Sequence, residues 1–468
     1  MPYRKQFASK VAHGDIIRNP EVADFLSECE YLRVPSDEEG KRMVQDKFLE
    51  PVSDGSTDLP LRVVSFDGSY HESSIDDKLP STKVGYVKVG CILIEMEKFN
   101  NLRRKEINLV DPFRVAALQR DNDSLTFSLP SANIRLKGKA SVRDSFRAAL
   151  DAHLHSAKTR FLPEDPTTSL RTTLFHLASR RQGVLGTNDV TRLKLHKCPS
   201  CEAGPLEITD TDAQQNCPQC KKEIYPSDCL RIWEEVSDFQ SNIQAMTRLM
   251  MMVEHMLPIH YIRYLLENDL ECLSKVSFFI DGPLAIFGNC AWLHGPIMSY
   301  IDRANYELTN MGLPPLLIIG LQKTGQVVDH VTLINRFVEN NRLFCIDDDY
   351  RYNFILTGRD PAGNGFGSET YYGQDYIYKT PSGRFFVFAL PYPFPSKKIE
   401  RVEFHQAKLD SERYPRLEQA LRLIQHFECD LYDNSVIPVA LAHKHTAISL
   451  VPGGQVLDLL TRRGLASK

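Results

Sequence analysis

Two cysteine pairs with the same spacing constrain this chain more than any other feature. Cys198 and Cys201 form one Cys-x2-Cys pair, and Cys217 and Cys220 form a second one after residues 202–216. Each pair fits a tight turn that presents two thiolates to one side of a tetrahedral zinc ion. We therefore predict a zinc ribbon over residues 195–225, with a structural Zn²⁺ that has no open position for catalysis. Four unrelated core cysteines are the alternative, but they do not explain two matched pairs in a polar segment.

The composition of the chain is that of a soluble globular protein. It has 468 residues, of which 42% are hydrophobic and 25% charged, and its net charge is −4. Eleven cysteines, an odd number, and a start without an apolar signal segment favour a reducing cytoplasm. Apolar runs such as 385–390 are far shorter than the roughly 20 residues that span a bilayer, so we expect no membrane segment. The near-neutral charge does not exclude nucleic acid, because clustered carboxylates cancel local basic grooves in the sum.

Two apolar runs end in the same dipeptide. Residues 61–66 predict a buried strand that stops at Asp67-Gly68, and residues 276–280 predict one that stops at Asp281-Gly282. An Asp at a strand end places its carboxylate at the rim of the sheet, and the following Gly lets the chain turn and a large substrate approach. Asp-Gly alone is a common turn. Two such carboxylates on neighbouring strands, however, can hold divalent cations about 4 Å apart, as in phosphodiester hydrolysis.

Further candidates lie on predicted helices and loops. A helix over residues 233–257 carries Glu254 at the edge of its apolar stripe and His255 pointing away. His443 stands in an apolar helix start, where it is either a metal ligand and acid–base group or a satisfied histidine. Lys323 follows a predicted strand at 316–321 and either neutralises a phosphate or is solvated. The run 347–349, three aspartates, is expected to be solvated charge in a turn.

These elements predict a mixed α/β sheet interrupted by a helical segment and the zinc ribbon. The expected parts are an N-terminal helical region (1–58), the first part of the core (59–130), a helical basic insertion (131–194), the zinc ribbon (195–225), a helical segment (226–275), the second part of the core (276–450) and a tail (451–468).

The chain resembles the NurA nuclease family, in its larger bacterial form, at three ordered motifs. These are Ser65-Phe66-Asp67-Gly68-Ser69, Phe279-Ile280-Asp281-Gly282-Pro283-Leu284 and Leu441-Ala442-His443. Segments 320–323 and 373–384 also look like that family. The resemblance covers roughly residues 60–450, with the zinc ribbon as an insertion.

The resemblance implies an RNase H-like α/β core, a homodimer and cleavage of DNA with Mn²⁺ or Mg²⁺. It also implies a HerA-type hexameric ATPase as partner, degradation from 5′ ends and cutting of single strands, in DNA end processing or defence against phage. By the same resemblance, Asp67, Asp281 and His443 match metal-binding residues, and Glu254, with Glu267 in reserve, matches the family's glutamate. Lys323 and Arg384 are expected to hold phosphates.

One position departs from that family pattern. Ser435 stands where the family often has a Tyr, and Tyr432 is nearby. This departure keeps a second hypothesis open, a non-catalytic subunit that binds DNA or assists assembly, and a third, a zinc-ribbon adaptor. The chain also lacks a G-x-x-x-x-G-K-[ST] run, which fits a nuclease that needs a separate ATP-driven motor.

Overall fold

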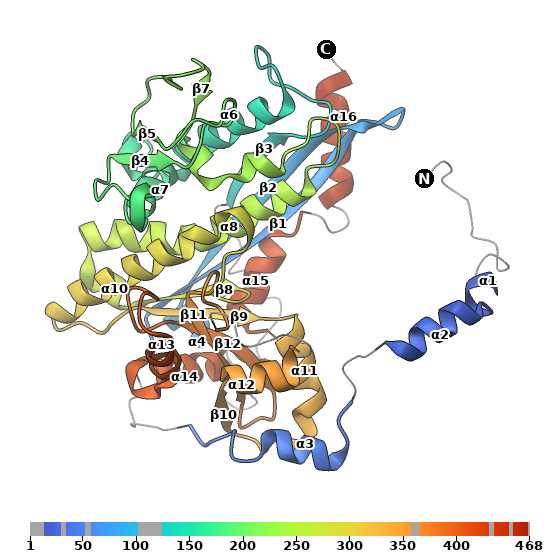
Figure 1. Cartoon of the computed structure of the whole chain (residues 1–468). Coiled ribbons are helices and arrows are strands. Elements are labelled where there is room, and N and C mark those ends of the chain that lie inside the picture. The colour runs from blue at the N-terminus through green and yellow to red at the C-terminus, as the bar shows by residue number, and fades with distance from the viewer. Residues whose placement is uncertain are drawn as a thin grey trace.

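The centre of the molecule is one mixed β-sheet. The computed structural model of the chain describes residues 14–29, 34–51, 58–101, 124–356, 365–429, 435–448 and 453–466. Eight strands form the sheet in the order β10-β11-β12-β9-β8-β1-β2-β3 (Figure 1). They are β1 (Arg62–Asp76), β2 (Leu79–Glu95), β3 (Ser124–Pro130), β8 (Val276–Asp281), β9 (Leu317–Gln322), β10 (Arg342–Cys345), β11 (Gly373–Lys379) and β12 (Phe385–Pro391).

The middle strands of the sheet are parallel. β1 pairs in parallel with β8, and β8 with β9, whereas the other neighbours are antiparallel. The order β3-β2-β1-β8-β9, with an antiparallel meander followed by two parallel strands, is that of an RNase H-like core, as predicted. Strands β8 and β9 are mostly apolar and buried along almost their whole length, because helices cover both faces of the sheet.

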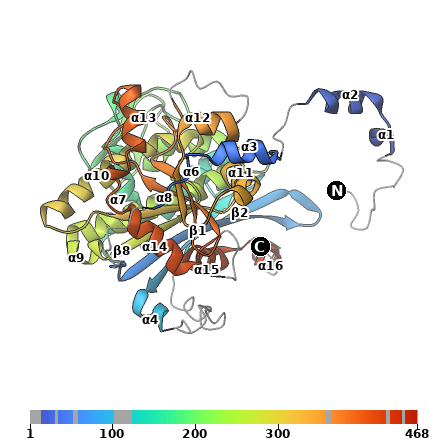
Figure 2. The ribbon, with the colours of Figure 1, turned by 90° about the horizontal axis from the view of Figure 1, so that it is seen from below.

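Helices cover the sheet on both faces, as Figure 2 shows from below. Helices α6, α7, α8 and α10 pack on one face around Phe66, and α14 and α15 pack on the other around Phe279. The helices are α1 (Gly14–Ile17), α2 (Pro20–Glu28), α3 (Asp37–Val44), α4 (Met96–Asn100), α6 (Val142–His155), α7 (Leu170–Ala178), α8 (Ile243–Asn268), α9 (Leu270–Ser274), α10 (His294–Asn310), α11 (Gln326–Ile334), α12 (Asp348–Tyr350), α13 (Arg401–Leu409), α14 (Leu417–Phe427), α15 (Ile437–Thr446) and α16 (Gly453–Ala466). Among the described residues, no helix combines the length and the hydropathy that a bilayer crossing requires.

Strand β1 does not stop at Asp67, contrary to the prediction from the Asp-Gly dipeptide. Its parallel pairing with β8 ends at Phe66, but its antiparallel pairing with β2 continues, with Asp67 opposite Gly90, as far as Asp76. A turn was predicted because Asp-Gly is a frequent turn pair, but the long β2 partner keeps the backbone extended. Asp67 therefore lies where β1 leaves β8, in mid-strand.

Helix α8 lies further along the chain than predicted. The expected start near Trp233 is a separate short helix, Ile232–Glu235, and α8 runs from Ile243 to Asn268. His255 is buried, not exposed, and its Nδ1 lies 2.7 Å from the hydroxyl of Tyr372. The apolar stripe does not predict the burial of His255, because α8 packs against the sheet on one side and against α7 and α10 on other sides.

The segments outside the sheet share its core. The basic segment before the ribbon forms α6 and α7, whose arginines are largely internal: Arg147 donates two hydrogen bonds of 2.7 Å to buried Asp228. The stretch expected as a tail contains α16, which packs on β1 and β2 through Thr461 (2.7 Å to Tyr86) and Asp458 (2.7 Å to Ser73). The domain boundaries themselves stay predictions.

Candidate metal centre

Three predicted ligands meet at the middle of the sheet. One ligand atom from each of Asp67, Asp281 and His443 lies within 4.8 Å of the others. His443 Nδ1 is 3.1 Å from Asp67 Oδ2, and Lys323 Nζ is 2.5 Å from Asp281 Oδ2. The side chain of His443 is half exposed, whereas that of Asp67 is 5% exposed. The cluster is thus open to solvent on the histidine side.

The fold explains why these distant residues meet. Phe66 of β1 lies opposite Ile280 of β8, so the next residues, Asp67 and Asp281, leave the paired region together. Helix α15 packs on β1, β2 and β8 through buried Leu441 and Ala442, and this contact carries the next residue, His443, to the two carboxylates.

Glu254 reaches the cluster from the opposite face of the sheet. It is buried, and its carboxyl accepts a hydrogen bond from the backbone N–H of Gly68. A Cβ at residue 68 would lie 2.7 Å from Glu254 Oε1 and 2.5 Å from Met250 Cγ, so only glycine leaves room here. Glu254 is not one of the three grouped ligands, but it lies beside them. Glu267 is half exposed and 3.7 Å from Arg263 of its own helix.

The carboxyl groups are electrostatically crowded. Burial raises the pKa of Asp281 to about 7; the charge of Asp67 adds to this shift, and Lys323 opposes it. Burial, together with Asp67 and Asp281, also raises the pKa of Glu254 well above its ordinary value. Burial alone would raise the pKa of Asp67, but hydrogen bonds, first from His443, lower it below the ordinary value. The pKa of Asp67 is thus lowered, whereas the pKa values of its neighbours Asp281 and Glu254 are raised.

Thr446 is a residue of this site that the sequence reasoning missed. It is fully buried, and its hydroxyl donates a 2.7 Å hydrogen bond to Asp67 Oδ2, the oxygen that also faces His443. The hydrogen bond between His443 and Asp67 raises the pKa of His443, so the imidazole is more readily protonated. The three-residue spacing between His443 and Thr446 on one helix was the available signal.

The donor set fits a divalent cation. Carboxylate oxygens suit Mg²⁺ and Mn²⁺, an imidazole nitrogen is a ligand of transition-metal ions, and crowded acids with raised pKa values gain most from an added positive charge. The residues that would hold the ion are Asp67, Asp281 and His443, with Glu254 next to them.

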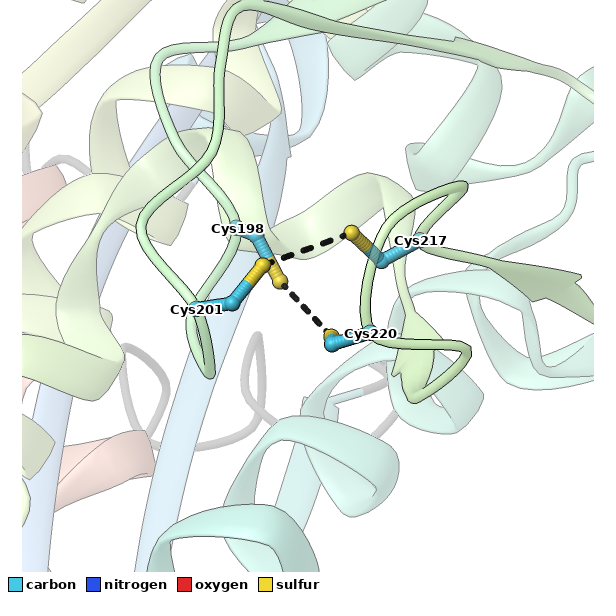
Figure 3. Close-up of side chains that lie close together, drawn as sticks. All are labelled: Cys198, Cys201, Cys217 and Cys220. Atoms are coloured by element: carbon cyan, nitrogen blue, oxygen red, sulfur yellow. Dashed lines mark hydrogen bonds between the residues drawn. The ribbon is translucent and has the colours of Figure 1, made fainter.

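The four ribbon cysteines form a second cluster (Figure 3). Their thiols point toward one another, with Sγ–Sγ distances of 3.7 Å for both Cys198–Cys220 and Cys201–Cys217. A tetrahedral zinc ion with Zn–S bonds of about 2.3 Å requires sulfur separations of about 3.8 Å. Each Cys-x2-Cys pair closes on a tight turn, with Glu202 N donating to Cys198 O and Lys221 N to Cys217 O, both at 3.0 Å. The geometry therefore fits the predicted structural zinc.

Other predicted features have different roles in the structure. Asp348 is buried, not solvated, because Lys408 Nζ (2.5 Å) and His405 (3.1 Å) pair with it. Arg384, expected to hold phosphate, forms an ion pair with Glu428 at 3.6 Å. Ser435 is buried, and Tyr432 lies outside the described residues.

Comparisons with known proteins bear on this arrangement. A sequence profile of the NurA domain matches residues 61–448. None of the curated proteins compared with the chain matches it. The chain is similar to a crystal structure described as the NurA nuclease from Sulfolobus solfataricus, at 7% identity and a TM-score of 0.34, over 98% of this chain and 99% of that one.

A second crystal structure, described as NurA, is similar at 10% identity and a TM-score of 0.25, over 96% of this chain and 94% of that one. These TM-scores are too low to carry an argument. The profile match, in contrast, spans well over half of the sequence and includes Asp67, Asp281 and His443. The chain therefore belongs to the NurA family.

Proposed function

We propose that this chain is a metal-dependent nuclease that hydrolyses phosphodiester bonds in DNA. The observation that carries the proposal is the convergence of Asp67, Asp281 and His443, from two strands and one helix, within 4.8 Å. Membership of the NurA family supports the same conclusion. A half-exposed histidine beside buried carboxylates leaves one side of the cluster accessible to a strand of DNA.

Each residue of the cluster has a role in this proposal. Asp67, Asp281 and His443, with Glu254 beside them, hold Mn²⁺ or Mg²⁺. Such an ion, when bound, lowers the pKa of a water and stabilises the departing oxygen. Lys323, 2.5 Å from Asp281, is placed to neutralise a phosphate once the ion takes over the carboxylate. Thr446 keeps Asp67 in position through its hydrogen bond.

The finer part of the proposal concerns substrate and partners. We infer 5′–3′ exonuclease and single-strand endonuclease activity, a homodimer and a HerA-type hexameric ATPase that feeds DNA to it, in end processing or anti-phage defence. The family supports these inferences, and the sequence supports a separate motor because it lacks a P-loop run.

The test is a cleavage assay on linear duplex and single-stranded DNA with Mn²⁺, Mg²⁺ or EDTA. We expect cleavage that requires metal and is lost in Asp67→Asn and Asp281→Asn. Asp302→Asn, at an exposed carboxylate of α10, is the matched control and should cut normally. Cleavage that persists in both cluster variants would refute the proposed centre.

A non-catalytic DNA-binding or assembly subunit is the second candidate. The observation that favours it is Ser435, at the position where the family often has a tyrosine. DNA binding in EDTA, together with intact DNA after incubation with Mn²⁺, would support this candidate. Co-purification with an ATPase, without DNA binding or cutting, would instead support a zinc-ribbon adaptor.

A further inference from the structure

A cationic cavity lies away from the carboxylate cluster. Its volume is about 400 Å³, and it lies between the residues after α7, the start of α10 and residues 396–398. We name it the Arg181 cavity. The lining includes three basic side chains, Arg181, Lys397 and Lys398, and no carboxylate from the described residues. Such a charge distribution favours an anion.

Two hydrogen-bond donors of the cavity lack acceptors. Arg181 Nη1 and Trp292 Nε1 are both buried and have no hydrogen-bond partner among the described residues. The guanidinium of Arg181 lies over the Trp292 ring, 4.1 Å from its centre, and this contact fixes both groups. Buried donors without acceptors cost free energy, and both donors belong to residues that line the cavity, so a ligand that accepts hydrogen bonds would stabilise them after a small shift of these side chains.

The lysines complete the positive lining. Lys397 Nζ donates hydrogen bonds to the carbonyls of Gly367 (2.6 Å) and Ser368 (3.1 Å). The side chain of Lys398 is exposed to solvent. Burial, with the charge of Lys408 adding to it, lowers the pKa of Lys397 to about 7. A bound anion would oppose that shift. The structure thus contains cations that a negative ligand would stabilise.

A larger cavity adjoins the Arg181 cavity and is lined by sequence neighbours of the carboxylate cluster. It measures about 720 Å³ and shares Ser368 with the Arg181 cavity. Its wall includes Pro283, two residues after Asp281, and both neighbours of Lys323. Aromatic rings line it as well, namely Phe287, Tyr352, Phe366 and Tyr371. Aromatic faces stack with the bases of single-stranded nucleic acid, so this cavity suits the nucleotides between the two sites.

We propose that the Arg181 cavity binds a backbone phosphate of a single DNA strand whose scissile bond lies at Asp67 and Asp281. The strand would pass through the larger cavity, with its bases against the aromatic rings. The identification of DNA as the source of the phosphate rests on the proposed function. The preference for a phosphate group rests on the cations and unpaired donors of the cavity itself.

The first test measures binding of a single-stranded oligonucleotide in EDTA by fluorescence anisotropy at several salt concentrations. Lys398→Gln and Arg181→Met should each weaken binding about fivefold, because one charge-assisted contact is lost. Each should also make the slope of log K against log salt shallower by about 0.7. Lys137→Gln, at another exposed lysine, is the control and should change neither. Lys398 is exposed, so its variant remains informative if Arg181→Met misfolds.

A second measurement distinguishes failure of this site from failure of the proposed function. Hydrolysis of bis(p-nitrophenyl) phosphate with Mn²⁺ reports the carboxylate cluster alone, because this small diester cannot reach the Arg181 cavity at the same time. We expect equal rates for the wild type and Lys398→Gln. If the wild type does not hydrolyse the diester, the proposed function fails, and the oligonucleotide titration still decides the binding site.

The source of the phosphate is tested with Trp292 as a reporter. The chain has two tryptophans, so Trp233→Phe leaves the Trp292 signal alone. A fluorescence change with oligonucleotide that Arg181→Met abolishes supports the proposal, whether or not inorganic phosphate also gives it at higher concentration. A change with inorganic phosphate or dAMP but none with oligonucleotide overturns the DNA assignment. No change with any of these probes, or unaltered oligonucleotide binding in Lys398→Gln, overturns the site.

Discussion

At the scale of single residues, the carboxylate cluster brings together acids whose negative charges repel one another when ionised. Asp281 lies beside Asp67 and its pKa is raised to about 7, mainly by burial, whereas an unfolded chain gives it a pKa near 3.8. The folded state therefore holds this proton more tightly than the unfolded state. By linkage, the contribution of Asp281 to stability is greatest below pH 4 and is lost as the pH rises to 7.

The first prediction concerns Asp281→Asn in metal-free protein. The amide cannot ionise, so at pH 8 the variant should be more stable than the wild type, by up to about 4 kcal/mol for a pKa raised from 3.8 to about 7. At pH 4, where Asp281 holds its proton, the difference should vanish. Thermal unfolding in EDTA at both pH values measures this. A large loss of stability at pH 8 would instead identify Asp281 as a structural cap.

The second prediction concerns Thr446, which positions Asp67. Thr446→Val removes the 2.7 Å hydrogen bond to Asp67 Oδ2 but keeps the shape of the side chain. Partners of metal ligands typically contribute about 10–100-fold in metal affinity, so we expect a higher Mn²⁺ concentration for half-maximal cleavage. Thr446→Ser retains the hydroxyl and should restore the wild-type Mn²⁺ dependence. Equal Mn²⁺ requirements in Thr446→Val and the wild type would exclude a positioning role.

At the scale of elements, the sequence predicts strands that the structure contains and acids that the structure brings together, but it gives a wrong reason for Gly68. Parallel strands are continuous apolar runs, so residues 276–280 and the acid after them could be read directly. The Asp-Gly dipeptide predicts a turn at Gly68 that lets substrate approach, yet Gly68 is an extended residue that leaves space for Glu254. Contacts between faces of a sheet, like the burial of His255, depend on tertiary packing that periodicity does not encode.

The third prediction follows from that contact. Gly68→Ala places a methyl group within 2.7 Å of Glu254 Oε1 and 2.5 Å of Met250 Cγ, so these side chains must move. We expect a loss of about 1–3 kcal/mol in stability and weaker cleavage. Gly14→Ala, where a Cβ meets nothing within 4 Å, is the control. Denaturant unfolding and the Mn²⁺-dependent rate, measured for both variants, decide the matter.

The fourth prediction concerns the ribbon as an element. Without zinc, the four thiols lose the ion that joins their two turns, so Cys198→Ser or chelation should raise hydrogen exchange over residues 195–225. The main sheet should stay protected, because β1 is hydrogen-bonded to a strand on each side, β2 and β8. Loss of protection throughout the sheet would show that the ribbon is required for the global fold. The contact that would transmit this loss is the shared core, in which Leu195 and Ile208 pack in the same cluster as Phe66.

At the scale of the whole molecule, the cluster joins segments that are nearly 400 residues apart, as the Asp67–His443 contact shows. An ion that binds β1, β8 and α15 together therefore stabilises the folded chain and not the unfolded one. The same ion must displace the proton that Asp281 holds below pH 7. Metal binding, global stability and pH are thus coupled through one site.

The last prediction tests this coupling. Mn²⁺ should raise Tm, and the increase should be larger at pH 8 than at pH 6, because at pH 6 a proton must leave Asp281 first. One released proton lowers the apparent affinity about tenfold per pH unit, which at saturating Mn²⁺ removes about 1.4 kcal/mol of stabilisation. Asp67→Asn should abolish the Mn²⁺ effect, whereas Asp302→Asn should not. A Tm increase that persists in Asp67→Asn would place the responsible ion elsewhere, and the ribbon cysteines would be the next site to examine.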